Sequence, residues 1–231
     1  MPKTALQQND MPMTTGSDVM TRSAHPAPMI VANDWQYGHD FARNVDQITA
    51  TTMVGGDYNK LQIYTNQAQW TRGALTDADV DIFAWHMLND FWAIKGGVNY
   101  SYKPAAYWQP GLGLEGTMPF FIETNIRSYW HDGSGQIDAI FSRNISLAGN
   151  WTLLTSVEAI AATQSLDYAQ IGWGFNSIQY SIGPSYQFLS GLALQLQYQY
   201  TRNYGDTASI LKANGQGPTS SLLTFGLEAV F

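Results

Sequence analysis

The residues with the clearest metal chemistry in this sequence are methionine and histidine, because the chain has 8 Met and 4 His but no Cys. Thioether sulfur prefers soft Cu(I), whereas imidazole also accepts Cu(II) or Zn(II). Residues 1–28 are rich in Pro, Thr and Gln, show no hydrophobic period and are predicted to form a disordered tail. The tail and its boundary carry several soft donors, namely Met11, Met13, Met20, His25 and Met29. Two interpretations stay open: a flexible metal-binding tail, or a linker whose methionines are incidental.

The elements that must position any site are predicted to be strands. From about residue 29 onward the sequence alternates between apolar and polar residues, as it does in residues 191–200, where Leu and Tyr alternate with Ala and Gln. About twelve such segments fill 29–231, which predicts one all-β domain. Connections after even-numbered segments are short, and those after odd-numbered segments are mostly longer. This pattern is typical of an antiparallel up-and-down barrel with short periplasmic turns and longer extracellular loops.

Composition indicates which face of these strands points inward. Only 13% of residues are charged, against roughly 25% in an ordinary soluble domain, and the polar face consists mainly of Gln, Ser, Thr, Asn and Gly. A water-facing exterior usually carries many Lys and Glu. Aromatic residues such as Trp70, Trp108, Trp130 and Trp151 fall near segment ends, as in interfacial girdles. We therefore expect a transmembrane β-barrel whose apolar face contacts outer-membrane lipid and whose polar face lines a hydrated lumen.

Net charge and the N-terminal sequence bear on the partners and the export of the protein. The net charge of −7 argues against nucleic acid as a partner, since nucleic-acid binding needs a basic surface. The first ten residues, "MPKTALQQND", lack the apolar core of a signal peptide. We expect a protein of the bacterial outer membrane whose export signal is not included in this chain.

The strand register predicts a set of charged side chains inside the lumen. We expect them to form ion pairs across it and to narrow it. A twelve-stranded barrel lies between the filled eight-stranded kind and the open porins, so passage of a small ion is favoured over free diffusion of large solutes. The predicted lumen charges are Asp79, Asp81, Lys95, Glu115, Glu123, Arg127, Asp138 and Glu158.

Methionine in a polar lumen is out of pattern, and the register predicts two such residues. Met53 shares the polar face with Thr49, and Met87 shares it with Asp81. Together with Met118 they are expected near the periplasmic mouth, beside an outward-pointing His86. Either these residues form a metal site, or the methionines fill gaps in a packed interior.

Several stretches of the barrel resemble the copper resistance protein B family of Gram-negative outer membranes. They are "GGDYNKLQIYT" (55–65), "DFWAIKGGVNYSY" (90–102), "GLGLEGTMPFFIE" (111–123), "SLAGNWTLLTSVE" (146–158), "YQYTRNYGDTA" (198–208) and "TFGLEAVF" (224–231). The resemblance covers most of 29–231, although the family's leaders are often richer in Met and His than residues 1–29 are. It implies an outer-membrane barrel, a copper ion, Cu(I) or Cu(II), as ligand, and a periplasmic copper protein as partner.

The sequence thus predicts a barrel without catalytic chemistry that binds copper and helps conduct it across the outer membrane, or holds it there. The predicted metal ligands are the tail donors together with Met53, Met87, Met118 and His86. A lipid hydrolase would need Ser, His and an Asn or Asp at one height on the outward face, and no Ser matches the outward His86. A structural or adhesive barrel is the remaining alternative.

Overall fold

The computed structural model describes residues 29–41, 44–165, 171–215 and 217–230. The predicted tail, with Met11, Met13, Met20 and His25, lies outside the described residues, and so does Phe231. Met29 is the first residue of the first strand.

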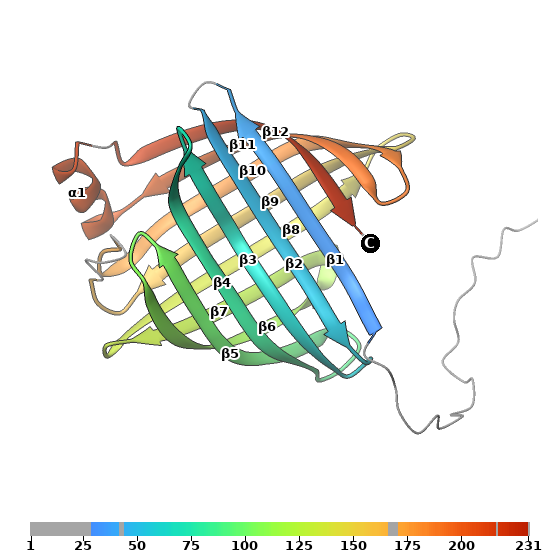
Figure 1. Cartoon of the computed structure of the whole chain (residues 1–231), viewed down its shortest axis with the longest axis horizontal. Helices are drawn as coiled ribbons and strands as arrows, with labels where there is room; N and C mark the ends of the chain where they lie inside the picture. The colour runs from blue at the N-terminus through green and yellow to red at the C-terminus, as the bar shows by residue number, and fades with distance from the viewer. Residues whose placement is uncertain (1–28, 42–43, 166–170, 216, 231) are drawn as a thin grey trace, which may run out of the picture.

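The described residues form twelve antiparallel strands, which confirms the predicted all-β fold (Figure 1). No described helix has the length and apolar character needed to cross a membrane. The strands are β1 Met29–Asp40, β2 Val45–Gly55, β3 Asn59–Thr71, β4 Ala74–Met87, β5 Trp92–Lys103, β6 Tyr107–Met118, β7 Ile122–His131, β8 Ser134–Ser146, β9 Trp151–Ala162, β10 Gly174–Leu189, β11 Leu192–Asn203 and β12 Thr219–Val230.

The sheet closes on itself because β1 pairs with β12. Their register runs from Asp34 opposite Val230 to His39 opposite Phe225. All remaining pairings join strands that are consecutive in the sequence. Closure matters in a membrane, since lipid offers no hydrogen-bond partner to the free backbone groups of a sheet edge.

The two faces of the wall are inverted relative to a soluble protein. On β11, Leu196 is 43% exposed on the outside, whereas its neighbour Gln195 is 6% exposed inside the barrel. The same holds on β12, where Phe225 is exposed and Thr224 is buried. Large apolar side chains thus cover the exterior, and the enclosed side chains are mostly polar.

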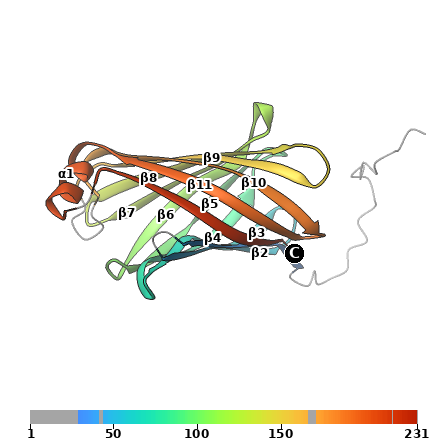
Figure 2. The same cartoon turned by 90° about the horizontal axis from the view of Figure 1, so that it is seen from above.

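The two ends of the barrel differ, but mainly through two connections. Strand β1 begins and β12 ends at the end with the short turns, and the described parts of the β9–β10 and β11–β12 connections lie at the other end (Figures 1 and 2). At this second end, β3–β4 and β7–β8 are joined by tight turns at Arg72–Gly73 and Asp132–Gly133. All four of these residues have positive φ, as the favoured two-residue hairpin turn requires. We call the two ends the turn end and the loop end.

A helix that the sequence pattern did not predict occupies the second long connection. Helix α1, Gly205–Ala213, packs against β10 at the loop end. Its buried Thr207 accepts a hydrogen bond from the Gly172 backbone N–H at 2.8 Å and donates one to Asn176 at 3.0 Å. A Cβ at position 172 would lie 2.4 Å from the Thr207 backbone nitrogen, so glycine permits this close approach. The helix is therefore fixed to both β10 and the neighbouring loop.

Candidate cation path through the lumen

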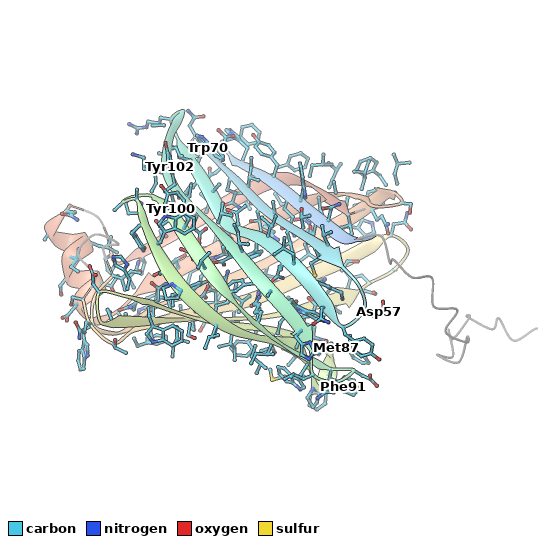
Figure 3. The ribbon with its side chains drawn as sticks, turned by 60° about the horizontal axis from the view of Figure 1, so that its bottom comes forward. Asp57, Trp70, Met87, Phe91, Tyr100 and Tyr102 are labelled. Carbon is cyan, nitrogen blue, oxygen red and sulfur yellow. The ribbon has the colours of Figure 1, made fainter. Side chains whose placement is uncertain are left out.

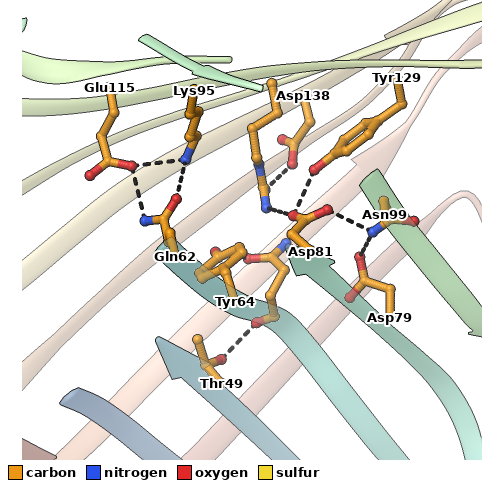
Figure 4. Close-up of polar contacts among 12 residues, drawn as sticks. Thr49, Gln62, Tyr64, Asp79, Asp81, Lys95, Asn99, Glu115, Tyr129 and Asp138 are labelled. Atoms are coloured by element: carbon orange, nitrogen blue, oxygen red, sulfur yellow. Dashed lines mark hydrogen bonds and ion pairs between the residues drawn. The ribbon is translucent and has the colours of Figure 1, made fainter. Parts of the chain in front are cut away.

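A lysine cluster lies in the half of the lumen nearer the turn end. Lys95 on β5 is almost completely buried, and its Nζ donates hydrogen bonds to Glu115 at 2.8 Å and to Gln62 at 3.1 Å (Figure 4). Gln62 on β3 also donates to Glu115, at 3.2 Å. The ammonium group thus has a charged and a neutral acceptor, which offsets part of its loss of hydration.

An arginine cluster lies further toward the loop end. Arg127 on β7 is 1% exposed and pairs with Asp138 on the adjacent strand and with Asp81 on β4, the latter at 3.1 Å. The Tyr129 hydroxyl donates to Asp81 at 2.7 Å, and the guanidinium carbon of Arg127 lies 4.8 Å from the ring centre of Tyr64. The cluster therefore ties β4 to β7 and β8 across the interior.

Amide side chains extend the arginine cluster. Asn99 donates from one amide nitrogen to Asp81 at 2.8 Å and to Asp79 at 3.0 Å, and its oxygen accepts a bond from Gln109 at 3.1 Å. Two carboxylates on one strand are thus held by a shared neutral donor, and Arg127 compensates the charge of only one of them. Part of the lumen wall consequently keeps an excess of negative charge.

Two adjoining polar cavities lie within the remaining lumen, and a third cavity lies at the turn end, next to Ser190 and Gly191. The turn-side cavity has a volume of about 290 Å³ and is lined by residues such as Asp34, Asn144 and Leu154. The loop-side cavity has a volume of about 270 Å³ and reaches Pro104 and Ile171 in the loops. Each could hold several waters or a hydrated ion.

The charge of the cavity linings favours cations. The described lining of the turn-side cavity includes four carboxylates, from Asp34, Glu123, Glu158 and Glu228, but no Lys, Arg or His. The loop-side lining also has four carboxylates, from Asp77, Asp79, Asp138 and Glu158, against two cations, Lys103 and Arg127. A low-dielectric wall around charges of one sign concentrates counter-ions in the space between them.

The eight charged residues predicted to line the lumen all point inward. Fewer of them than expected form ion pairs across the lumen. Of three ion pairs among them, only Arg127–Asp81 joins strands that are not neighbours. Within the described chain, Asp79, Glu123 and Glu158 have no cationic partner at ion-pair distance. The sequence reasoning missed further inward carboxylates, among them Asp34, Asp77 and Glu228, although the polar register of β12 includes Glu228.

The predicted methionine ligands lie at one end but not around one point. Met53 faces the lumen opposite Gln62, which pairs in turn with Phe83. Met87 lies at the turn end (Figure 3), four residues past Phe83 on β4, or about 13 Å further along the strand.

Met118 and His86 sit differently from these two. Met118 is the last residue of β6 and lies on the same face of the strand as the outward Leu112. Its side chain therefore does not point into the lumen. His86 is outside, as its register predicted, with its Nδ1 2.8 Å from the side-chain oxygen of Asn59. In the described part of the chain, no group of three or more His, Asp or Glu side chains has the geometry of a metal site.

Comparison with known proteins decides the family. The model of the family described as copper resistance protein B precursor (CopB) matches residues 31–231. The chain belongs to the CopB family. The match spans the whole described barrel apart from its first two residues, Met29 and Ile30, so the family assignment rests on the barrel rather than on the tail.

Solved structures show the fold of this CopB family member. A NanC porin is 12% identical with a TM-score of 0.57, covering 85% of this chain and 98% of the porin. A KdgM porin is 10% identical with a TM-score of 0.50, covering 87% of this chain and 99% of the porin. No curated protein matches the chain significantly. Family and fold together place the protein in the bacterial outer membrane, surrounded by lipid.

Proposed function

We propose that this barrel binds copper ions in its lumen and conducts them across the outer membrane, or holds them there, without catalysing a reaction. The observation that carries the proposal is the turn-side cavity, whose described lining has four carboxylates and no cationic side chain. Such a cavity attracts cations and repels anions. Membership of the CopB family supports copper as the relevant cation.

The soft donors supply the second part of the proposal. Met53 and Met87 offer thioethers at the turn end, where copper enters or leaves the lumen. Met118 and His86 lie at the same end but outside the lumen, and the tail donors Met11, Met13, Met20, His25 and Met29 deliver the ion to it. A periplasmic copper protein is the proposed partner at this end.

Copper flux into proteoliposomes tests the proposed function. We expect saturable entry of copper, reported by an enclosed copper-sensitive dye, into vesicles that contain the full chain, and slower entry when residues 1–28 are removed. Empty vesicles set the leak. Entry no faster than this leak, together with no saturable copper binding by the purified barrel, would favour a purely structural or adhesive barrel.

The thioether ligands are tested by substitution. Replacing Met53 and Met87 together with Leu keeps side-chain volume and is expected to weaken copper binding at least about tenfold, or ~1.4 kcal/mol. Copper titration of the detergent-solubilised protein measures this. The control is Leu61→Met, which adds a thioether on the outward face of β3 and should leave the affinity unchanged. Equal affinities for the double variant and the wild type would remove both residues from the site.

A further inference from the structure

The two cavities meet at three residues. Asn66, Glu158 and Gln179 are the side chains that line both the turn-side and the loop-side cavity. Glu158 is the ionisable one among them. Any ion that moves between the two cavities must therefore pass this group.

An irregularity in β3 presents Asn66 to the lumen. Toward β4, the register steps from Tyr64–Asp81 to Gln69–Asp77, so β3 uses five residues where β4 uses four. Toward β2, the register shows one extra β3 residue over the same stretch. Such a bulge re-aims a side chain and leaves a backbone group unpaired. Here the Thr49 hydroxyl donates to the Asn66 carbonyl oxygen at 2.7 Å, which satisfies that group.

The Asn66 side chain is held at both of its polar atoms. Its oxygen accepts a hydrogen bond from the Tyr64 hydroxyl at 2.6 Å, and its nitrogen donates to the Glu158 carboxylate at 3.0 Å. This second bond joins β3 to β9, which are not neighbours in the sheet. The Tyr64 ring in turn lies against the guanidinium group of Arg127. The bridge across the lumen is thus braced by the arginine cluster.

We propose that the Asn66–Glu158 hydrogen bond is a latch that closes the passage between the two cavities, and that the Glu158 carboxylate is the group on which a cation crosses. A cation that reaches Glu158 replaces the Asn66 amide as the partner of the carboxylate, and this exchange opens the latch. An anion gains nothing from the exchange. The inference rests on the proposed function only for the identity of the ion, because the latch acts on cations in general.

Conductance of the full-length protein in planar lipid bilayers, with KCl as the probe, tests the latch. Asn66→Ala removes the bridge but keeps the charge, so single-channel conductance is expected to rise severalfold with cation preference retained. Asn66→Asp also opens the latch, because it places two carboxylates side by side. Asn59→Ala makes the same chemical change on the outer surface as Asn66→Ala and should leave the conductance unchanged. Unchanged conductance in both Asn66 variants would overturn the latch.

The role of Glu158 is tested by ion selectivity. Glu158→Gln keeps a hydrogen-bond acceptor for Asn66 but removes the charge, so the K⁺/Cl⁻ permeability ratio, taken from the reversal potential in a KCl gradient, is expected to fall severalfold. Asp132→Asn, in an exposed turn at the loop end, is the charge-matched control. A permeability ratio that Glu158→Gln leaves unchanged would overturn the crossing role.

These readouts separate the latch from the proposed function. The KCl measurements involve no copper, and the liposome measurement follows copper alone. Altered KCl conductance in the latch variants, with no copper flux in the wild type, would keep the latch and reject copper conduction. Copper flux in the wild type, with KCl conductance unaffected by the variants, would do the reverse.

Discussion

Arg127 and Lys95 are charged side chains that are almost completely enclosed, and each is held by carboxylate partners. Taking such groups out of water is unfavourable, and their partners offset this penalty only while both members are present. Arg127 faces two carboxylates, Asp81 and Asp138, whereas Lys95 faces the partly exposed Glu115. At the scale of single residues, the interior of the barrel is thus stabilised by charge compensation rather than by apolar packing.

Removing the arginine is expected to be the more damaging change. Arg127→Met leaves Asp81 and Asp138 enclosed without a counter-charge, so the free energy of unfolding should fall by about 3–5 kcal/mol. Lys95→Met should lower it less, because Glu115 keeps contact with water. Urea unfolding in detergent micelles, followed by tryptophan fluorescence, measures both. Arg143→Met, on the exposed face of β8, gives the baseline, and a loss for Arg127→Met no greater than this baseline would contradict the argument.

At the scale of elements, the loop end is organised by one helix and one hydroxyl. Thr207 joins α1 to Gly172 and to β10 through its two hydrogen bonds. Local elements of this kind open separately from the rest of a fold, with free energies below that of global unfolding. A substitution at Thr207 should therefore lower the local stability of the loop end without changing the stability of the barrel wall.

Replacing Thr207 with Val removes both hydrogen bonds at nearly constant volume. Losing about 1–2 kcal/mol of local stability should speed amide hydrogen exchange in α1 and around Gly172 by roughly five- to thirtyfold. Exchange in β2 to β5 should stay as in the wild type. The control is Ser209→Ala, which alters an exposed hydroxyl on the same helix. Equal exchange in Thr207→Val and Ser209→Ala would show that this contact does not fix the helix.

The strands were predictable because their signal is local. Alternation on β11 and β12 reports the two faces of the wall directly, and the same alternation on β5 and β7 identified the inward positions of Lys95 and Arg127. Helix α1 was missed because "DTASILKA" lies between two strong strand patterns, and Tyr204 at its N-cap makes no side-chain capping bond that could mark a start. The Asp-Gly turn at 132–133, by contrast, has a signature that the sequence displays.

The latch could not be predicted from the sequence. Alternation from Gln62 and Tyr64 already places Asn66 on the inward face, but its height there depends on a bulge that no short pattern marks. Its partner Glu158 is 92 positions away, and only the closure and tilt of the whole barrel bring the two together. The separation of Met53 from Met87 has the same origin, because strand stagger is set by pairing around the sheet rather than by either strand alone.

At the scale of the whole molecule, everything depends on which medium the outer wall contacts. Ile82 lies in an outward apolar row with Ile63 and Val98, far from both ends of β4. Phe120 is equally apolar and more exposed, at 76% against 40% for Ile82, but it lies in the turn between β6 and β7. If the wall spans a bilayer, depth rather than exposure decides how a charge is tolerated at these two positions.

Ile82→Arg should therefore lower the free energy of unfolding from lipid vesicles by about 2–4 kcal/mol, and Phe120→Arg by only ~0–1 kcal/mol, because the turn end reaches hydrated headgroups. Denaturant titration in phospholipid vesicles, with folding followed by the heat-dependent shift in gel mobility, measures both. If the wall faced water, both substitutions should lower the free energy of unfolding only slightly, since an exposed isoleucine can be replaced by arginine at little cost. Similar small losses for the two variants would show that the row around Ile82 does not contact hydrocarbon, and the barrel would then need another orientation.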